Sequence, residues 1–503
     1  METLQHLMGG FATALSPANL LFATIGCVLG TLIGVLPGLG PAAGTALLIP
    51  ITFKLEPTSA IIMLAAIYYG AMYGGTITSV LVNVPGEAAS VVTCLDGYAM
   101  AKQGRAGAAL GIAAIGSFIG GSIATLGLVV MALPLSRFAL KFGPPEYFSL
   151  ILVGLSLVMA LAGKSLTKAL LMGVVGLIFS FVGIDPIEGA PRFDFGITPL
   201  LDGIRFVPVV MGFFGIGEIL VNSEQPLENV VVEEGKVSSF LPKRDEWRIC
   251  ASSINRGTWL GFFLGLIPGT NSAVAAFMSY AIEKKVSKHP EKFGTGIIEG
   301  VAAPETANNS YANAALIPLF TLGIPGSPTV AILMGALIMN GLTPGPLLFS
   351  QHATFVWAVI ASLYIGNVIL LILNLPLVNL WAKLLKIPYN ILVVFILVFC
   401  IIGAYSLNNS VFDVGMMTFC GLLGYVFKKL DFPLAPAILT LILGPLMERS
   451  LRESLSLSQG DYSIFFTRPI SLVLLIITAI IFVTSAWQAL PSAVREESKG
   501  AQV

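Results

Sequence analysis

Long uncharged apolar stretches constrain the fold of this chain more than any other feature of its sequence. A helix needs about 20 apolar residues to cross the hydrocarbon core of a bilayer. Stretches of that order are Ala106–Pro134, Tyr147–Ala162, Phe355–Trp381, Ile387–Leu407 and Pro469–Leu490. Shorter or interrupted ones are Leu166–Ile184, Phe206–Val221, Val411–Phe427 and Phe432–Met447. The sequence therefore predicts an all-α polytopic membrane protein with roughly ten to twelve transmembrane helices, some of them broken or re-entrant.

Composition argues against several other classes of protein. Only 11% of the residues are charged, whereas a soluble domain has about 25%. Lys plus Arg and Asp plus Glu both total 27, so there is no basic surplus to bind a nucleic acid. The three histidines are scattered, the five cysteines lack disulfide or zinc spacing, and Gly163–Ser165 lacks the first glycine of a P-loop. We therefore expect no enzyme active site, no transition-metal centre and no nucleotide cofactor.

A charged stretch, residues 222–256, separates two apolar halves that carry the same interruptions. The segment GTLIGVLPGLGPA, which starts at Gly30, recurs 231 residues later as GFFLGLIPGTNSA. Val84–Gly86 recurs as Ile324–Gly326 at an offset of 240. We predict a first repeat half at 1–221, a solvated linking loop at 222–256, a second half with the C-terminal spans at 257–490, and a polar tail at 491–503. Duplication with matched breaks is typical of secondary transporters.

The Pro-Gly breaks indicate where a binding site lies. Pro and Gly interrupt a helix and leave backbone N–H and C=O groups without their helical partners. Such groups persist at membrane depth only where they are buried in protein or line a polar cavity. A half-helix that starts after a break offers N–H groups to a carboxylate. The predicted substrate-binding residues are the breaks and their polar neighbours: Pro37, Gly38, Gly40, Asn83, Pro85, Gly86, Ser90, Pro268, Gly269, Thr270, Asn271, Ser272, Pro325, Gly326 and Ser327.

Oxygen-bearing side chains beside the breaks suggest a second, cation-coupling role. Glu87 is expected in the first turn of a half-helix, where it either couples a cation or complements the helix dipole. A polar face on Phe293–Leu319, with Glu299 and Glu305, is expected to meet water or the other half. The predicted cation-coupling residues are Ser79, Asn83, Glu87, Asn308, Asn309, Thr321 and Thr329. No metal other than sodium is expected.

Four long motifs carry a family resemblance. They are GVLPGLGPAAG, YGGTITSVLVNVPGEAASVVTCLDGYAMAKQGRAGAALG, GLIPGTNSAVAAF and EGVAAPETANNSYANAALIPLFTLGIPGSPTVAILMGAL. The chain resembles the large transmembrane subunit of the tripartite tricarboxylate transporter family. The resemblance implies a multi-pass permease of the bacterial inner membrane, which works with a small four-helix membrane subunit and a periplasmic solute-binding protein. It also implies inverted repeats, elevator-type alternating access, and import of citrate or related carboxylates on a sodium or proton gradient.

Several alternatives stay open on the sequence alone. A carboxylate or anion channel is one rival, and an intramembrane enzyme, which would need a focused constellation of catalytic groups, is another. Neutral Ser, Thr and Asn oxygens favour sodium as the coupling ion, whereas Glu87 keeps a proton open. The identity of the carboxylate, the orientation of the helices and the oligomeric state, a homo-oligomer included, are not determined.

Overall fold

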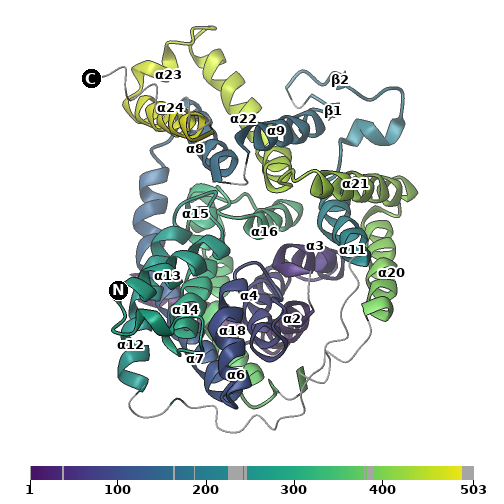
Figure 1. Cartoon of the computed structure of the whole chain (residues 1–503). Helices are drawn as coiled ribbons and strands as arrows, with labels where there is room; N and C mark the ends of the chain where they lie inside the picture. The colour runs from purple at the N-terminus through teal and green to yellow at the C-terminus, as the bar shows by residue number, and fades with distance from the viewer. Residues whose placement is uncertain are drawn as a thin grey trace, which may run out of the picture. The chain divides into compact units, whose positions relative to one another are not determined.

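The computed structural model describes residues 2–36, 39–161, 165–185, 187–224, 242, 246–378, 380–381 and 389–489, and these residues are mostly helical (Figure 1). Within them the only strands are β1 (Gly183–Ile184) and β2 (Pro191–Arg192), which pair antiparallel. Eight of the described helices are long and apolar enough to cross a membrane: Pro17–Val35, Pro57–Val82, Ala106–Ala139, Pro144–Leu161, Phe206–Ser223, Ala353–Asn374, Val411–Lys429 and Pro469–Trp487. Four shorter apolar helices accompany them. The prediction of an all-α polytopic membrane protein is confirmed, while the number of crossings stays a prediction.

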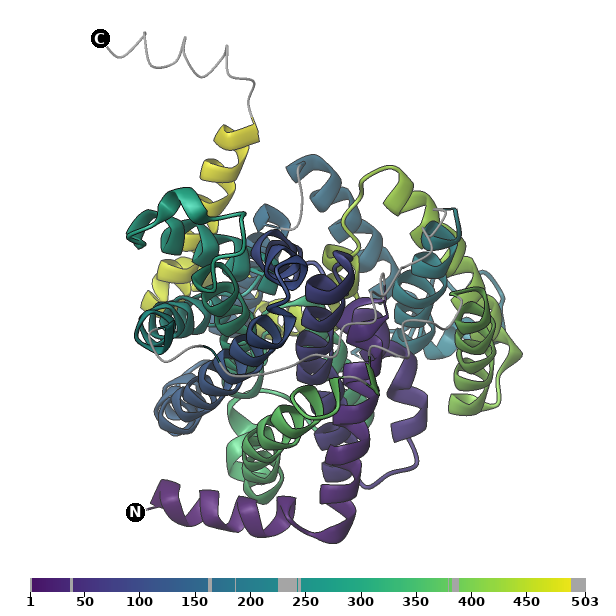
Figure 2. The same ribbon diagram turned by 60° about the horizontal axis from the view of Figure 1, so that its bottom comes forward.

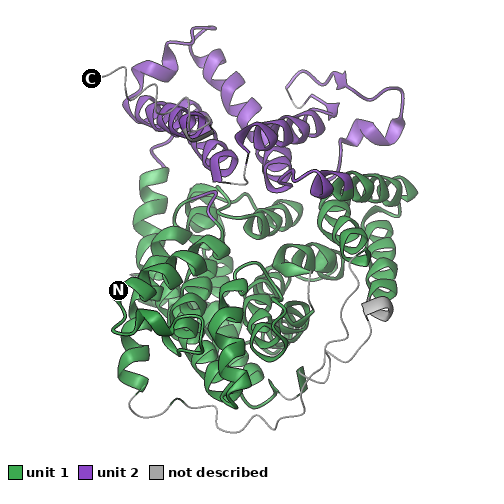
Figure 3. Cartoon of the chain, viewed as in Figure 1, with its two compact units in different colours: residues 1–139, 207–267, 271–425 green, residues 140–206, 268–270, 426–503 purple. Residues whose placement is uncertain are grey.

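The helices form two compact units (Figure 3). Unit 1 comprises residues 1–139, 207–267 and 271–425, and unit 2 comprises residues 140–206, 268–270 and 426–503. Each unit draws on sequence from both sides of the charged stretch, so this division differs from the two predicted repeat halves. Those halves stay a prediction from the sequence. Residues 225–241 and 243–245 of the predicted loop lie outside the described part, and its last residues, from Glu246, are helical.

Unit 1 contains the longest buried helices. Its elements are α1 (Glu2–Ala14), α2 (Pro17–Val35), α3 (Gly40–Thr52), α4 (Pro57–Val82), α5 (Val91–Thr93), the π-helix η1 (Cys94–Tyr98), α6 (Ala99–Lys102), α7 (Ala106–Ala139), α10 (Phe206–Val210), the π-helix η3 (Met211–Ile216), α11 (Gly217–Ser223), α12 (Glu246–Gly265), α13 (Ser272–Val286), the 3-10 helix η4 (Pro290–Lys292), α14 (Glu299–Ala314), α15 (Leu316–Leu322), α16 (Pro328–Met339), α17 (Pro346–Gln351), α18 (Ala353–Asn374), α20 (Tyr389–Asn408) and α21 (Val411–Lys429). Phe206 and the last turn of α21 fall in unit 2. Helix α1 packs along α18 (Figure 2).

Small residues allow two helix pairs in unit 1 to approach closely. Helix α2 packs on α4, and a Cβ on Gly34 would lie 2.2 Å from the Ala71 carbonyl oxygen. Helix α12 packs on α14 in the same way, and a Cβ on Gly261 would lie 2.2 Å from the Ala307 carbonyl oxygen. Glycines at helix contacts are a common device for packing in membranes. The repeated glycines therefore have a packing role in both halves.

Unit 2 is smaller and is built around α22. Its elements are α8 (Pro144–Leu161), α9 (Leu166–Ser180), β1, β2, the 3-10 helix η2 (Thr198–Asp202), α22 (Ala435–Leu457), α23 (Ile464–Thr467) and α24 (Pro469–Ala489). Helix α22 packs on α8 and α9, and α24 packs on α8. The β1–β2 loop is held to α22 by ion pairs, in which Arg452 contacts Asp185 at 2.8 Å and Arg192 contacts Glu448 at 2.7 Å.

Candidate functional site

The second pair of breaks ends its preceding helices in the same backbone conformation. Asn83 terminates α4 with a left-handed φ of 57°, and Gly323 terminates α15 with a left-handed φ of 71°. These two residues are separated by the offset of 240 that relates the two Pro-Gly pairs. A residue in this conformation stops a helix, and Asn and Gly adopt it at the least cost. The chain therefore leaves each helix in the same manner just before its Pro-Gly pair.

The two helices after the second-half breaks begin with side-chain caps. Ser327 Oγ accepts the backbone N–H of Val330 at 3.3 Å at the start of α16. Asn271 Oδ1 accepts the backbone N–H of Val274 at 2.8 Å at the start of α13. Ser327 is buried, whereas Asn271 is exposed. Each cap satisfies one of the free N–H groups at its helix start, and the others remain directed away from the helix.

The Pro85–Gly86 break is packed more tightly than the Pro325–Gly326 break. A Cβ on Gly86 would lie 1.9 Å from the Gly34 carbonyl oxygen and 2.7 Å from the Gly75 Cα. A Cβ on Gly326 would meet nothing closer than 3.4 Å, at Ala315. The backbone of the first break is thus wedged between α2 and α4, where only a glycine fits.

Glu87 does not lie in the first turn of a helix, so that expectation is wrong. The helix after this break begins only at Val91, and Glu87 belongs to the non-helical connection before it. The backbone N–H of Glu87 donates to Ser90 Oγ at 3.3 Å, and Ser90 Oγ donates back to the Glu87 carbonyl at 2.9 Å. The buried carboxylate points to α14, where Asn308 Nδ2 donates to its Oε1 at 2.7 Å. Two predicted cation-coupling residues, Glu87 and Asn308, are therefore in direct contact.

A second buried carboxylate, Glu305, lies one helical turn from Asn308 on α14. Thr76 Oγ1, on α4, donates to its Oε2 at 2.6 Å, and Thr93 Oγ1 donates to its Oε1. Glu305 is 1% exposed, and no basic side chain contacts it or Glu87 in the described part of the chain. We call Thr76, Glu87, Ser90, Thr93, Glu305 and Asn308 the carboxylate cluster. It joins α4, the first break, α5 and α14, all within unit 1.

The rest of α14 is equally buried. All of its residues are shielded, and the helix packs against α12, α7, α13 and α4, so its polar face meets protein. Asn309 Nδ2 donates to Ser117 Oγ on α7 at 2.7 Å. The side-chain oxygens of Asn308 and Asn309 have no hydrogen-bond partner. Polar atoms left without a partner at such depth are costly, so they are candidate ligand positions.

The remaining predicted residues are dispersed. Ser79 and Thr321 donate to carbonyls of their own helices, at Gly75 and Ile317. Gly40 starts α3 with a φ of 59°, Ser272 starts α13, and Thr329 is buried in the first turn of α16. Pro268, Gly269 and Thr270 belong to unit 2, where a Cβ on Gly269 would lie 2.6 Å from the Leu157 carbonyl carbon. Pro37 and Gly38 lie outside the described residues.

Sequence reasoning did not include three members of the carboxylate cluster among the site residues: Thr76, Thr93 and Glu305. Glu305 carried a usable signal, because an ionisable residue in a membrane segment is a functional candidate by default. Thr93 stands among the polar residues beside the Pro85–Gly86 break, which was a signal as well. Thr76 carried none, since Thr is common at helix contacts in membranes. The five cysteines are free, and no three His, Cys, Asp or Glu side chains group as metal ligands among the described residues.

Comparisons with known proteins identify the family of this chain. The model of the tripartite tricarboxylate transporter TctA family matches residues 20–439. A protein of Agrobacterium vitis, described as an uncharacterized 52.8 kDa protein in the TAR-I ttuC' 3' region, is 48% identical over 475 residues, which cover 94% of each chain. A second protein of that organism, described as uncharacterized and in the TAR-II ttuC' 3' region, is 48% identical over 215 residues, 43% of this chain and 89% of that protein. No solved structure matches the chain. The chain therefore belongs to the tripartite tricarboxylate transporter TctA family.

Proposed function

We propose that this chain is the large membrane subunit of a cation-driven secondary transporter, not an enzyme or a channel. It imports tricarboxylates such as citrate, or related small carboxylates, across the bacterial inner membrane. A periplasmic binding protein delivers the substrate, and a small four-helix membrane subunit completes the complex. The observation that carries the proposal is the pair of matched helix breaks, Asn83–Gly86 and Gly323–Gly326, inside the buried helices of unit 1. Paired broken helices are the usual binding elements of secondary transporters.

The two breaks differ in charge, which supports different roles for them. Position 327 carries a neutral serine at the start of α16, and the N–H groups and positive dipole end of a helix start favour a carboxylate. The equivalent position in the first half carries Glu87, which would repel an anion and attract a cation. We therefore assign the substrate carboxylate to the Ser327 break and the coupling cation to the Glu87 break.

Inverted repeats and elevator-type movement are part of the same proposal. Helices α2 and α3 both pack on α4 in the first half, and α12 and α13 both pack on α14 in the second. Each set is followed by a break and then by a long apolar helix, α7 or α18. This correspondence supports two copies of one structural unit, and such repeats allow alternating access by moving one group of helices against another.

The test is uptake by proteoliposomes that contain this chain, its small membrane partner and its binding protein. Labelled citrate and a panel of dicarboxylates are supplied with and without an imposed sodium or proton gradient. We expect accumulation of at least one carboxylate against its own gradient. A channel would only equilibrate the solute, and an absence of accumulation with every compound under both gradients would overturn the substrate class.

One substitution pair tests the site itself. Both Asp and Asn are good helix caps, so Ser327→Asp and Ser327→Asn should both preserve the start of α16. The aspartate adds a negative charge where the substrate carboxylate is proposed to bind, so we expect its KM to rise at least about tenfold, since like charges at a contact cost several kcal/mol. The asparagine variant is the matched neutral control. Equal KM values for the two variants would place the substrate elsewhere.

A further inference from the structure

The start of helix α16 offers hydrogen-bond donors. Ser327 Oγ accepts the backbone N–H of Val330 at 3.3 Å, and the other first N–H groups of a helix have no partner within it. The carbonyl at the break is already used, because the Tyr311 hydroxyl of α14 donates to the Gly326 oxygen at 3.3 Å. The break is also loosely packed, since a Cβ on Gly326 would meet nothing closer than 3.4 Å. A helix start of this kind suits an anion.

A buried tyrosine hydroxyl from the first half lies at this helix start. Tyr68 belongs to α4, which packs on α16, and the residue is 1% exposed. Its hydroxyl is close enough to Ser327 and Tyr311 to interact with them electrostatically, yet no atom in the described part of the chain is in hydrogen-bonding geometry with it. A buried hydroxyl without a partner is costly, so a ligand that supplies one is bound favourably.

The chemistry of the Tyr68 hydroxyl matches a carboxylate. A tyrosine hydroxyl can donate, and a carboxylate can only accept, so the two form a charge-assisted hydrogen bond. The N–H groups and positive dipole end of α16 favour the same negative charge. A cation would face the positive end of that dipole, and a water molecule would satisfy the hydroxyl without compensating the dipole.

We propose that Tyr68 is a substrate-binding residue, whose hydroxyl donates a hydrogen bond to the substrate carboxylate at the start of α16. Both halves of the chain then build the carboxylate site, with the hydroxyl from α4 and the N–H groups from α16, all within unit 1. This inference rests on the proposed function. It adds to it a residue that lies outside the Pro-Gly breaks and their neighbours.

The test is substrate binding by the full chain with its small membrane partner, purified in detergent. The melting temperature is followed by tryptophan fluorescence during titration with citrate, or with the dicarboxylate of the panel that wild-type proteoliposomes accumulate. A ligand that binds the folded state raises the melting temperature in a saturable way, which gives a half-saturating concentration.

Tyr68→Phe removes the hydroxyl and keeps the ring. Because the hydroxyl has no partner within the protein, we expect the melting temperature without substrate to be unchanged. We expect the half-saturating concentration to rise about 10- to 100-fold, which corresponds to the loss of a hydrogen bond to a charged group.

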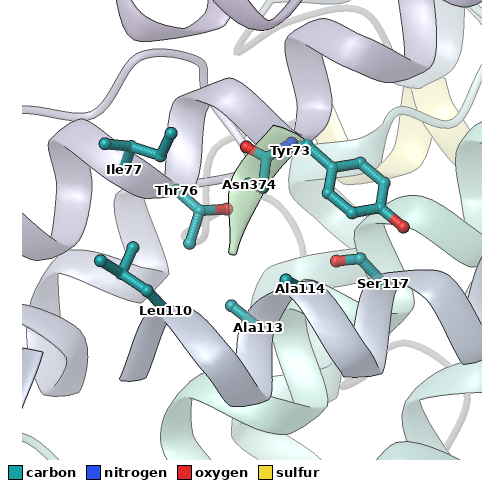
Figure 4. Close-up of a pocket in the computed structure, with 8 residues that line it drawn as sticks. All are labelled: Tyr73, Thr76, Ile77, Leu110, Ala113, Ala114, Ser117 and Asn374. Atoms are coloured by element: carbon teal, nitrogen blue, oxygen red, sulfur yellow. The ribbon is translucent and has the colours of Figure 1, made fainter. Parts of the chain in front are cut away.

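The matched control is Tyr73→Phe. Tyr73 lies on the same helix, is 3% exposed and also has an unpartnered hydroxyl. The two tyrosines are five residues apart, which is about 140° around a helix. Tyr73 lines a small pocket with Ala114 and Ser117 of α7 (Figure 4). We therefore expect the half-saturating concentration of this variant to equal that of the wild type.

Two results would overturn the inference and leave the proposed function standing, provided that wild-type proteoliposomes accumulate the carboxylate. One is a half-saturating concentration that Tyr68→Phe leaves unchanged or that Tyr73→Phe raises as much. The other is a lower melting temperature of substrate-free Tyr68→Phe with unchanged binding, which would make the hydroxyl a structural group. If the wild type accumulates no carboxylate, both the inference and the proposed function are overturned.

Discussion

Replacing the glycine of each Pro-Gly break by alanine should affect stability very differently in the two halves. At Gly86 the added Cβ would lie 1.9 Å from the Gly34 carbonyl oxygen and 2.7 Å from the Gly75 Cα. Both are backbone atoms of packed helices, so neither can move aside as a side-chain end could. At Gly326 the nearest atom would be 3.4 Å away, which is ordinary contact.

The magnitudes follow from these distances. Overfilling a packed core costs about 1–3 kcal/mol, and contacts with rigid backbone belong at the upper end. Neither glycine has a positive φ, so alanine also stabilises by about 0.4–1 kcal/mol through the unfolded chain. We expect Gly86→Ala to destabilise by about 2–3 kcal/mol. We expect Gly326→Ala to be neutral or to stabilise by up to about 1 kcal/mol.

The assay is denaturant unfolding in detergent micelles, followed by circular dichroism. The same chemical change at equivalent positions makes each variant the control for the other. The expected difference between them is about 3 kcal/mol. Unfolding free energies that agree within about 0.5 kcal/mol, the usual range for harmless substitutions, would refute the tight packing of the first break between α2 and α4.

Other parts of the chain give further predictions. Asp96 is buried; its Oδ1 accepts the backbone N–H groups of Gly294, Gly296 and Ile297, and its Oδ2 accepts the Tyr280 hydroxyl. Asp96→Ala should therefore destabilise by at least about 3 kcal/mol in the same unfolding assay, and by more than Asp96→Asn, which keeps one acceptor oxygen. Equal losses for the two variants would contradict a role for that acceptor oxygen. Backbone N–H groups of residues 187 and 188 and the Arg452 guanidinium lower the pKa of Asp185 to about 2, so its stabilisation is full above its unfolded pKa of about 4 and is lost as pH falls toward 2. The melting temperature of Asp185→Asn should therefore fall less than that of wild type between these pH values, and parallel curves would count against the ion pair. Cys94 is half-buried, while the other four thiols are buried, so a maleimide should label Cys94 first in folded protein. Cys94→Ala should remove this fast phase of labelling, and a fast phase that survives would contradict the exposure pattern.

The sequence by itself determined the class of the protein and the places where its helices stop. Long uncharged apolar runs form membrane helices, because the backbone N–H and C=O groups of a segment in a bilayer must be hydrogen-bonded within the protein. Pro-Gly pairs and their repetition at fixed offsets are also local features, and they located the ends of α4 and α15. The match of residues 20–439 to a transporter family agrees with the resemblance carried by these motifs.

Only the tertiary structure decided which side chains meet. Glu87 and Asn308 are 221 residues apart, and Thr76 and Glu305 are 229 apart, yet each pair is hydrogen-bonded. Periodicity places a residue on a helix face but does not select the partner helix. That selection depends on close approaches such as Gly34 to Ala71 and Gly86 to Gly34, which bring α2, α4 and the first break together, and on the packing of α14 against α4. The helix after the first break begins only at Val91, so Glu87 is not the expected cap but a partner of α14.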